Sequence, residues 1–124
     1  MDGHETRILL VDDMPLVLGA LQRGLQRHGY EPALADSARG ALEQLQREPF
    51  AVLVSDYKMP EHDGLWLLAQ TRLLCPDCHR VLISGGPVPD IKVHLDDGLV
   101  ERFLHKPISG AELAACVAGL CGEE

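Results

Sequence analysis

Carboxylates follow two short apolar runs of this chain. Asp12 and Asp13 come after residues 8–11, and Asp56 comes after residues 51–55. Apolar runs of this length that are rich in Val, Leu and Ile are typical of strands covered on both faces of a parallel sheet. Ligands collect in the crevice beyond the carboxyl ends of such strands. A single Asp in this position would be expected to cap a turn, but two acidic strand exits favour a shared site.

A hydroxyl and an amine follow two further runs. Ser84 ends the run 80–84, and Lys106 comes shortly after residues 100–104. Carboxylates that share a crevice repel one another unless a cation neutralises them or their proton affinity rises. Mg²⁺ suits such a crevice, because it binds carboxylates, keeps several waters and accepts a phosphate oxygen. A phosphoryl group held by Mg²⁺, Lys106 and Ser84 would have Asp56 as its acceptor, since carboxylates form aspartyl-phosphate intermediates.

The elements that would position these residues alternate between strand and helix. Helices are predicted to begin at Pro15 and behind the capping residues Ser37, Asp63 and Ser109, with a shorter helix at 89–97. The predicted strands are 7–11, 31–35, 51–55, 80–84 and 100–104. Five such units require right-handed crossovers. The predicted fold is therefore α/β, a doubly wound five-stranded parallel sheet with helices on both faces, in a single domain.

Composition limits the partners. A chain of 124 residues is long enough for one domain with one core. Its 19 acidic and 11 basic residues give a net charge of −8, which argues against direct binding to nucleic acid or to an anionic membrane and favours a cation as ligand. No apolar run reaches membrane-spanning length and no signal peptide opens the chain, so we expect a soluble, cytoplasmic protein.

The four cysteines fall into two pairs. Cys75 and Cys78 have the C-x-x-C spacing of redox and metal sites, whereas Cys116 and Cys121 are five residues apart in a predicted helix. The second C-x-x-C pair of a structural zinc site is missing. We therefore expect reduced thiols in a loop and in a helix.

From Arg7 to about Leu120 the chain resembles the receiver domain of two-component response regulators, with residues 1–124 as the domain and 7–120 as its core. The order of the motifs, and their position at successive strand ends, make the likeness specific. They are Asp12-Asp13, Asp56, Met59-Pro60 with Asp63-Gly64, Ser84 followed by Gly85, and Lys106-Pro107. The resemblance implies a CheY-like, flavodoxin-like fold with strand order 2-1-3-4-5.

The resemblance also implies a function. Asp56 would accept a phosphoryl group from a phosphohistidine of a sensor histidine kinase in an Mg²⁺-dependent transfer, and Ser84 and Lys106 would bind the phosphoryl oxygens. Such a domain is a switch, not a turnover enzyme. The metal ligands implied besides Asp56 are Asp13 directly, Asp12 largely through water, and the backbone carbonyl of Lys58.

In the family, phosphorylation draws the hydroxyl residue inward and an aromatic residue of the fifth strand rotates into the vacated space. Ser84 and Phe103 occupy the matching positions, although Phe103 as plain core is a competing interpretation. The movement would reshape the face of the 89–97 helix, the fifth strand and the last helix, where an effector or a second copy would dock. The Lys106-Pro107 bond would be cis, which would direct the lysine into the crevice.

Two alternative functions share parts of this pattern. A haloacid-dehalogenase-like phosphatase also uses an aspartyl nucleophile and Mg²⁺, but it requires D-x-D after the first strand, and this chain has Asp12-Asp13 followed by Met14 and Pro15. A degenerate receiver would act only as a protein-docking module, and the presence of every acidic and basic site residue argues against it.

Three further residues are individual to this chain. Lys58 places an amine at one rim of the site, while Gly86 leaves the opposite rim bare. We hypothesise that water enters at the bare rim and that the lifetime of the aspartyl phosphate depends on Lys58. The alternative is that Lys58 is a solvated loop lysine. Trp66 is expected to face outward, because Leu65 and Leu68 take the inward side of the predicted helix.

Overall fold

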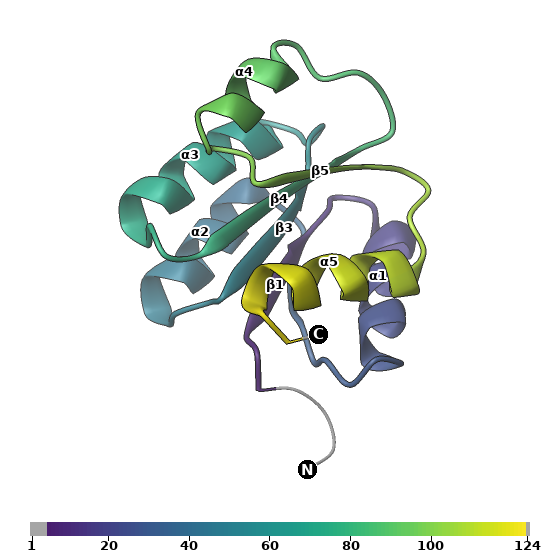
Figure 1. Ribbon diagram of the computed structural model, residues 1–124. Coiled ribbons are helices and arrows are strands. Elements are labelled where there is room, and N and C mark those ends of the chain that lie inside the picture. Colours follow the sequence, from purple (N-terminus) through teal and green to yellow (C-terminus); the bar gives the residue numbers. More distant parts are fainter. Residues whose placement is uncertain (1–4, 124) are drawn as a thin grey trace.

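A parallel five-stranded sheet lies at the centre of the structure (Figure 1). The computed structural model describes residues 5–123, and its strand order is β2-β1-β3-β4-β5. The elements are β1 Ile8–Val11, α1 Pro15–Gln26, β2 Ala33–Ala35, α2 Ala38–Arg47, β3 Val52–Asp56, α3 Gly64–Leu74, β4 His79–Ser84, α4 Ile91–Asp96, β5 Arg102–His105 and α5 Gly110–Cys121. The predicted fold class and the predicted strand order are both confirmed.

The helices cover both faces of the sheet. Helices α1 and α5 lie on one face, and α2 and α3 lie on the other (Figure 1). Because successive side chains of a strand point to opposite faces, Ile8 and Leu10 of β1 pack with the α1 and α5 core, and Leu9 and Val11 pack with the α2 and α3 core. All four are at most 2% exposed. Burying each such side chain stabilises the fold by about 1.5–3 kcal/mol.

Four of the five predicted helix starts are confirmed in atomic detail, whereas α4 begins at Ile91 and not at residue 89. Helix α1 has Pro15 at its first position, where the missing N–H costs no hydrogen bond. The side-chain oxygens of Ser37, Asp63 and Ser109 each accept a hydrogen bond from the backbone N–H three residues later. Each of these caps contributes about 0.5–2 kcal/mol, so local sequence alone determines where these helices begin.

Some boundaries differ from those predicted. Strand β5 is Arg102–His105, not 100–104, although Val100 is completely buried. Burial alone therefore does not define where the strand begins. A strand requires pairing with its neighbour, and the first residue of β5 that pairs with β4 is Arg102. Strand β2 is shorter than 31–35, and α4 has only six residues. Among residues 5–123, no helix is long and apolar enough to cross a membrane.

The orientation predicted for Trp66 was wrong. Its side chain is partly buried, packs against the α2 and α3 core, and stacks on the His62 ring with a centroid distance of 3.8 Å. Leu67 and Leu68 are completely buried, whereas Leu65 is only partly buried. Packing of Leu67 and Leu68 in the core sets the rotation of α3 on the sheet and brings Trp66 over the preceding loop.

Helices α1 and α5 touch through two glycines. A Cβ atom added to Gly24 would lie 2.6 Å from the Cα of Gly110, and one added to Gly110 would lie 2.5 Å from the Cα of Gly24. Real Cβ atoms do not approach backbone so closely, so no residue with a side chain fits at this crossing unless the helices separate. The close approach brings α5 onto α1, and the segment that joins β5 to α5 contains Lys106.

Replacing Gly24 by Ala is expected to lower the free energy of unfolding by about 1–3 kcal/mol, because backbone must move to admit the methyl group. Gly19 in the same helix is the matched control. A Cβ there would meet only the end of the Arg23 side chain, at 3.2 Å, so Gly19→Ala is expected to be neutral or to stabilise by up to ~1 kcal/mol. Urea unfolding of both variants measures the difference, and equal stabilities would contradict the proposed close contact.

Candidate functional site

Strand register brings the polar strand exits together. Strands β1 and β3 pair residue by residue up to Val11 and Ser55, so the next residues, Asp12 and Asp56, lie level with each other. Beyond β4, the backbone N–H of Lys106 donates to the carbonyl of Ser84 at 2.9 Å. The parallel pairing therefore places residues from four separate stretches of the chain at one edge of the sheet.

One ammonium group joins two buried carboxylates at this edge. The Nζ of Lys106 lies 2.9 Å from Asp12 Oδ2 and 3.0 Å from Asp56 Oδ1. Asp12 is 1% exposed and Asp56 is 7% exposed, while the Lys106 side chain is 20% exposed. Hydrogen bonds between charged groups are about twice as strong as neutral ones, so this bridge holds β1, β3 and the segment after β5 together.

A third carboxylate completes an acidic cluster. Oxygen atoms of Asp12, Asp13 and Asp56 all lie within 4.8 Å of one another, and this is the only such group of potential metal ligands in the described part of the chain. One ammonium cannot balance three carboxylates, so the cluster retains negative charge. All three side chains offer the oxygen donors that Mg²⁺ prefers, and the residues present therefore fit this ion.

The surroundings shift the proton affinities of two members of the site. Burial raises the pKa of Asp56; the hydrogen bond from Lys106 opposes this rise, and the charges of Asp12 and Asp13 add to it. Burial lowers the pKa of Lys106, but its hydrogen bonds to Asp12 and Asp56 outweigh that effect, and the pKa lies above its ordinary value. Lys106 is therefore a permanent cation at neutral pH.

Ser84 lines the same cleft but is bonded to its own loop. Its Oγ donates to the carbonyl of Gly86 at 2.8 Å and accepts the Gly86 backbone N–H at 3.2 Å. The predicted phosphoryl contact of this hydroxyl would replace these two bonds. A Cβ atom on Gly86 would have no atom within 4 Å, so this rim of the cleft is open, as the sequence indicated.

Phe103 lies in β5 and Lys58 lies at the rim of the cleft, the positions that the sequence predicted. The Phe103 side chain is half-buried beside the α2 and α3 core, with its ring edge-on to that of His105 at a centroid distance of 4.7 Å. Lys58 is exposed and lines the cleft. The Lys106-Pro107 peptide bond is cis, as predicted.

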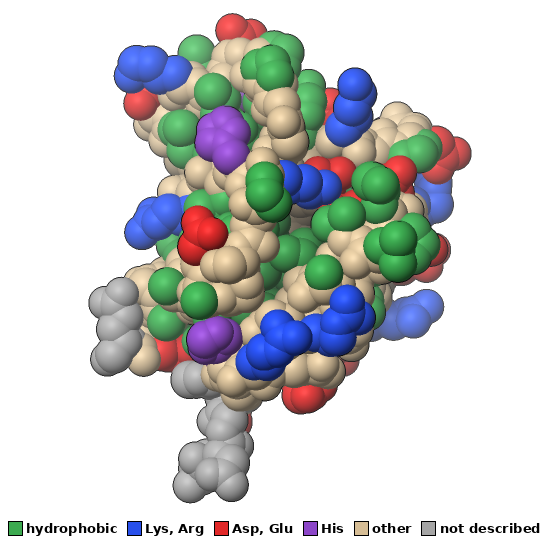
Figure 2. Space-filling view, turned by 90° about the vertical axis from the view of Figure 1, so that its right-hand side faces the viewer, with side chains coloured by type: hydrophobic (Ala, Val, Ile, Leu, Met, Phe, Trp, Pro, Cys, Tyr) green, Lys and Arg blue, Asp and Glu red, His purple; other side chains and the backbone are tan. Residues whose placement is uncertain are grey.

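The cleft has a volume of about 850 Å³. Figure 2, which views the right-hand side of Figure 1, shows hydrophobic side chains around a hollow in this face, with acidic and basic groups beside them. One lining residue that was not predicted is Met14, which is 55% exposed. Its backbone N–H donates to Asp12 Oδ1 at 2.9 Å. The sequence did contain a signal for this residue, because an apolar side chain between Asp13 and Pro15 belongs to no periodic apolar pattern.

A glycine fixes the loop behind Asp56. The backbone N–H of Gly64 donates to the carbonyl of Tyr57 at 2.7 Å. A Cβ atom on Gly64 would lie 2.3 Å from the carbonyl oxygen of Asp56. Helix α3 therefore begins directly against the residue at the centre of the site, which is the physical reason for a glycine after Asp63.

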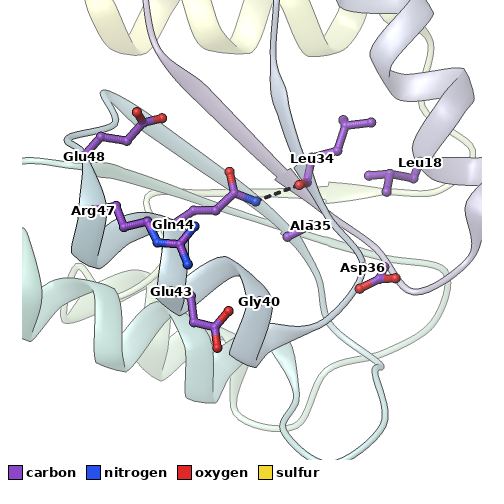
Figure 3. A pocket seen from close by; sticks show the side chains of 9 residues that line it. All are labelled: Leu18, Leu34, Ala35, Asp36, Gly40, Glu43, Gln44, Arg47 and Glu48. Carbon is purple, nitrogen blue, oxygen red and sulfur yellow. Dashed lines mark hydrogen bonds between the residues drawn. The ribbon is translucent and has the colours of Figure 1, made fainter.

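A second hollow lies at the free edge of β2 (Figure 3). It has a volume of about 610 Å³ and is lined mainly by residues of α2 and β2, with Leu18 of α1 beside them. Gln44 reaches from α2 and donates to the carbonyl of Leu34 at 2.7 Å, which blocks this sheet edge (Figure 3). None of the predicted site residues lines this hollow.

The fold and the acidic cleft together define a doubly wound α/β domain whose site lies at the carboxyl ends of its strands. Residues 8–118 match the response regulator receiver domain, and the chain belongs to that family. The curated relatives include the alginate biosynthesis transcriptional regulatory protein AlgB of Pseudomonas putida, 33% identical over 115 residues, which are 93% of this chain and 26% of AlgB. The chain thus spans about a quarter of the length of such regulators.

Shorter relatives and solved structures agree. The response regulator receiver protein CpdR of Brucella abortus is 33% identical over 101 residues, which are 82% of this chain and 84% of CpdR. The signal receiver domain of an HD domain-containing protein from Pseudomonas fluorescens Pf-5 is 29% identical, covers 96% of each chain and has a TM-score of 0.87. A CheY-like receiver domain protein from Methanospirillum hungatei JF-1 is 25% identical, covers 95% of each chain and has a TM-score of 0.86.

Replacing Lys106 by Met is expected to lower the free energy of unfolding by about 1–3 kcal/mol, because it leaves two buried carboxylates without their counter-charge. Added Mg²⁺ should recover part of this loss. Lys92→Met is the control: Lys92 forms an ion pair with Asp96 but its side chain is 85% exposed, so a change below ~0.5 kcal/mol is expected. Thermal unfolding with and without Mg²⁺ measures both, and equal effects of the two substitutions would refute the role of the bridge.

Proposed function

We propose that this chain is a phosphoacceptor switch, in which Asp56 receives a phosphoryl group from a phosphohistidine of a sensor histidine kinase. The observation that carries the proposal is the contact of Asp56 with Lys106 inside a cluster of three carboxylates that opens into a cleft. A buried carboxylate with one cation at hydrogen-bonding distance is suited to nucleophilic attack on phosphorus.

The transfer exchanges one bond for another. A carboxylate oxygen of Asp56 forms a bond to phosphorus as the phosphorus–nitrogen bond of the phosphohistidine breaks, and the electron pair of that bond returns to the imidazole. Lys106, and Ser84 once its bonds to Gly86 are released, bind the phosphoryl oxygens and stabilise their charge. Mg²⁺, held by Asp12, Asp13, Asp56 and the backbone carbonyl of Lys58, would neutralise the charge that develops on these oxygens.

The kinase must reach Asp56 over an adjoining surface. An apolar groove of about 430 Å³ opens beside the cleft and shares Lys106 with it, its other walls being residues of α1 and of the segment between β5 and α5. Leu16 of α1, in this groove, is 87% exposed. Exposed apolar surface of this kind marks protein contacts, and its position would let one partner touch α1 while its phosphohistidine enters the cleft.

The output would pass through the face of α4, β5 and α5. Phosphoryl binding would draw Ser84 from Gly86, and Phe103, whose ring now lies against His105, would move toward the space that this opens. On α4, Val93 is 59% exposed and Leu95 is 39% exposed, which leaves apolar surface for an effector or for a second copy of the chain. We place this function in the cytoplasm, where kinases have ATP.

Two alternatives remain weaker. A haloacid-dehalogenase-like phosphatase needs D-x-D after β1, and the chain has Asp12-Asp13-Met14 there. A receiver that serves only for docking would not need the bridge from Lys106 to Asp12 and Asp56. Both alternatives predict that Asp56 acquires no lasting phosphoryl group.

Incubation with acetyl phosphate and Mg²⁺ is expected to add about 80 Da, the mass of one phosphoryl group carried as an aspartyl phosphate. Intact-mass measurement detects the product, and Asp56→Asn should abolish it while the protein stays folded. Omission of Mg²⁺ should reduce it strongly. Turnover of added phosphomonoesters without a lasting adduct would instead support the phosphatase, and no adduct in any condition would support the docking module.

Replacing Lys58 by Ala is expected to shorten the lifetime of the aspartyl phosphate about fivefold, equivalent to ~1 kcal/mol of lost hydrogen bonding and of shielding from water. The opposite rim at Gly86 is already open, so removal of the amine would leave both rims bare. Lys92→Ala, remote from the cleft on α4, is the control. The decay of the adduct is followed by mass in EDTA, and an unchanged decay rate would refute this role of Lys58.

A further inference from the structure

The turn between α3 and β4 carries two cysteines at the end of the sheet opposite the Asp56 cleft (Figure 1). Cys75 is the C-cap residue of α3, and the backbone N–H of Cys78 donates to the carbonyl of Cys75 at 3.0 Å. The Cα atoms of the first and last residues of such a turn lie within about 7 Å. A disulfide needs about 4.4–6.8 Å, so a turn of this kind is compatible with one.

The two thiols lie close enough for each to shift the pKa of the other. The Sγ of Cys78 donates to the carbonyl of His79 at 3.6 Å. Cys75 is partly exposed and Cys78 is 2% exposed. Both line a surface hollow of about 510 Å³, together with residues from the start of the described chain and from the segment before β3. A small molecule can therefore approach Cys75 from solvent, while Cys78 is buried beneath the surface.

Arg80 holds this turn from inside. Its guanidinium donates to the backbone carbonyl of Cys78 at 2.9 Å and to that of Pro76 at 3.4 Å. It also donates to the carbonyls of Gly98 and Leu99 at 3.1 and 3.0 Å, which belong to the connection between α4 and β5. Arg80 is only 7% exposed. The turn is thus fixed in a closed conformation, and bringing the sulfurs together costs little chain entropy.

We infer that Cys75 and Cys78 form an oxidisable dithiol, a modification site that closes to an intramolecular disulfide by exchange with a small disulfide such as glutathione disulfide. The Cys75 thiolate attacks one sulfur of the small disulfide, forms a mixed disulfide and releases one thiolate. The Cys78 thiolate then attacks Cys75 Sγ and releases the second. In total the dithiol loses two protons and two electrons, and the small disulfide gains them as two thiols.

A metal site fits this pair less well. In the part of the chain that the structure describes, no third His, Cys, Asp or Glu joins the two sulfurs in a ligand group. Burial also raises the pKa of Cys75, and raises that of Cys78 to about 12. A metal would require both thiolates in this environment, whereas a disulfide is neutral. The same burial predicts that exchange is slow near neutral pH and accelerates as pH rises.

Tryptic cleavage separates the two cysteine pairs of this chain. Cys75 and Cys78 fall together in the peptide 73–80, and Cys116 and Cys121 fall together in the peptide that follows Arg102. The second pair is the control: five residues of α-helix separate its members by roughly 7.5 Å along the axis, beyond the span of a disulfide. The pairs are equal in number of thiols but differ in geometry.

The intact chain is incubated with glutathione disulfide at several pH values, and free thiols are then alkylated. The peptide 73–80 is expected to lose about 2 Da and to take up no alkylating agent, because two hydrogens have left as the bond formed. The control peptide should take up two alkyl groups. Dithiothreitol should restore alkylation of the peptide 73–80, and the rate of closure should rise with pH.

A Cys78→Ser variant tests the order of attack. It is expected to accumulate a stable mixed disulfide with glutathione at Cys75, since no second thiol can displace it. The inference is overturned if the peptide 73–80 of the unaltered chain remains fully alkylated, if it carries glutathione without closing, or if it links to Cys116 or Cys121. Because the main measurement uses the unaltered chain, a folding defect of the variant cannot imitate any of these results.

Discussion

The ammonium group of Lys106, held between the carboxylates of Asp12 and Asp56, is the interaction on which this structure depends. Three carboxylates whose oxygens lie within 4.8 Å would repel one another, and two of them, on Asp12 and Asp56, are buried. Lys106 reduces that repulsion without removing it, because one positive charge faces three negative ones. The residual charge makes the site receptive to a divalent cation, and the cation and Lys106 together can hold the oxygens of a phosphoryl group. The same cluster, with three negative charges and one positive charge, thus influences both the stability of the domain and its ability to bind a cation and a phosphoryl group.

The rest of the fold supplies the geometry that this cluster requires. Parallel pairing brings the ends of β1 and β3 level, and the cis bond at Lys106-Pro107 lies where the chain turns from the cleft toward α5. Two close backbone approaches leave no room for side chains: Gly24 against Gly110 between α1 and α5, and Gly64 against the carbonyl of Asp56. These contacts place the helices on the sheet and leave the polar edge accessible. Membership of the receiver family is consistent with this division between a packed scaffold and a charged edge.

The two ends of the sheet have different chemistry. The carboxyl ends of the strands carry the acidic cleft. There the Ser84 side chain forms hydrogen bonds to Gly86 in the loop from β4 to α4. The opposite end carries the thiols of Cys75 and Cys78, held by Arg80. Arg80 also bonds to the connection between α4 and β5, so α4 is attached to the sheet at both ends through polar contacts with its flanking segments. Helix α4 has no buried residue of its own. These polar contacts, together with the packing of Val88, Leu99 and the partly buried Ile91 against the α2 and α3 core, position the proposed output face.

Much of this protein follows from its sequence alone. Apolar runs that end in Asp12-Asp13 and Asp56 predicted the strands and the acidic site, and Ser37, Asp63 and Ser109 predicted helix starts, because caps and strand cores depend on local chemistry. Tertiary structure decided the rest. The rotation of α3 brought Trp66 onto His62, pairing with β4 set where β5 begins, and Arg80 tied the turn that carries Cys75 and Cys78 to the connection between α4 and β5. Spacing along the chain does not encode these outcomes, since each depends on how a local segment packs against the sheet or against a segment distant in sequence.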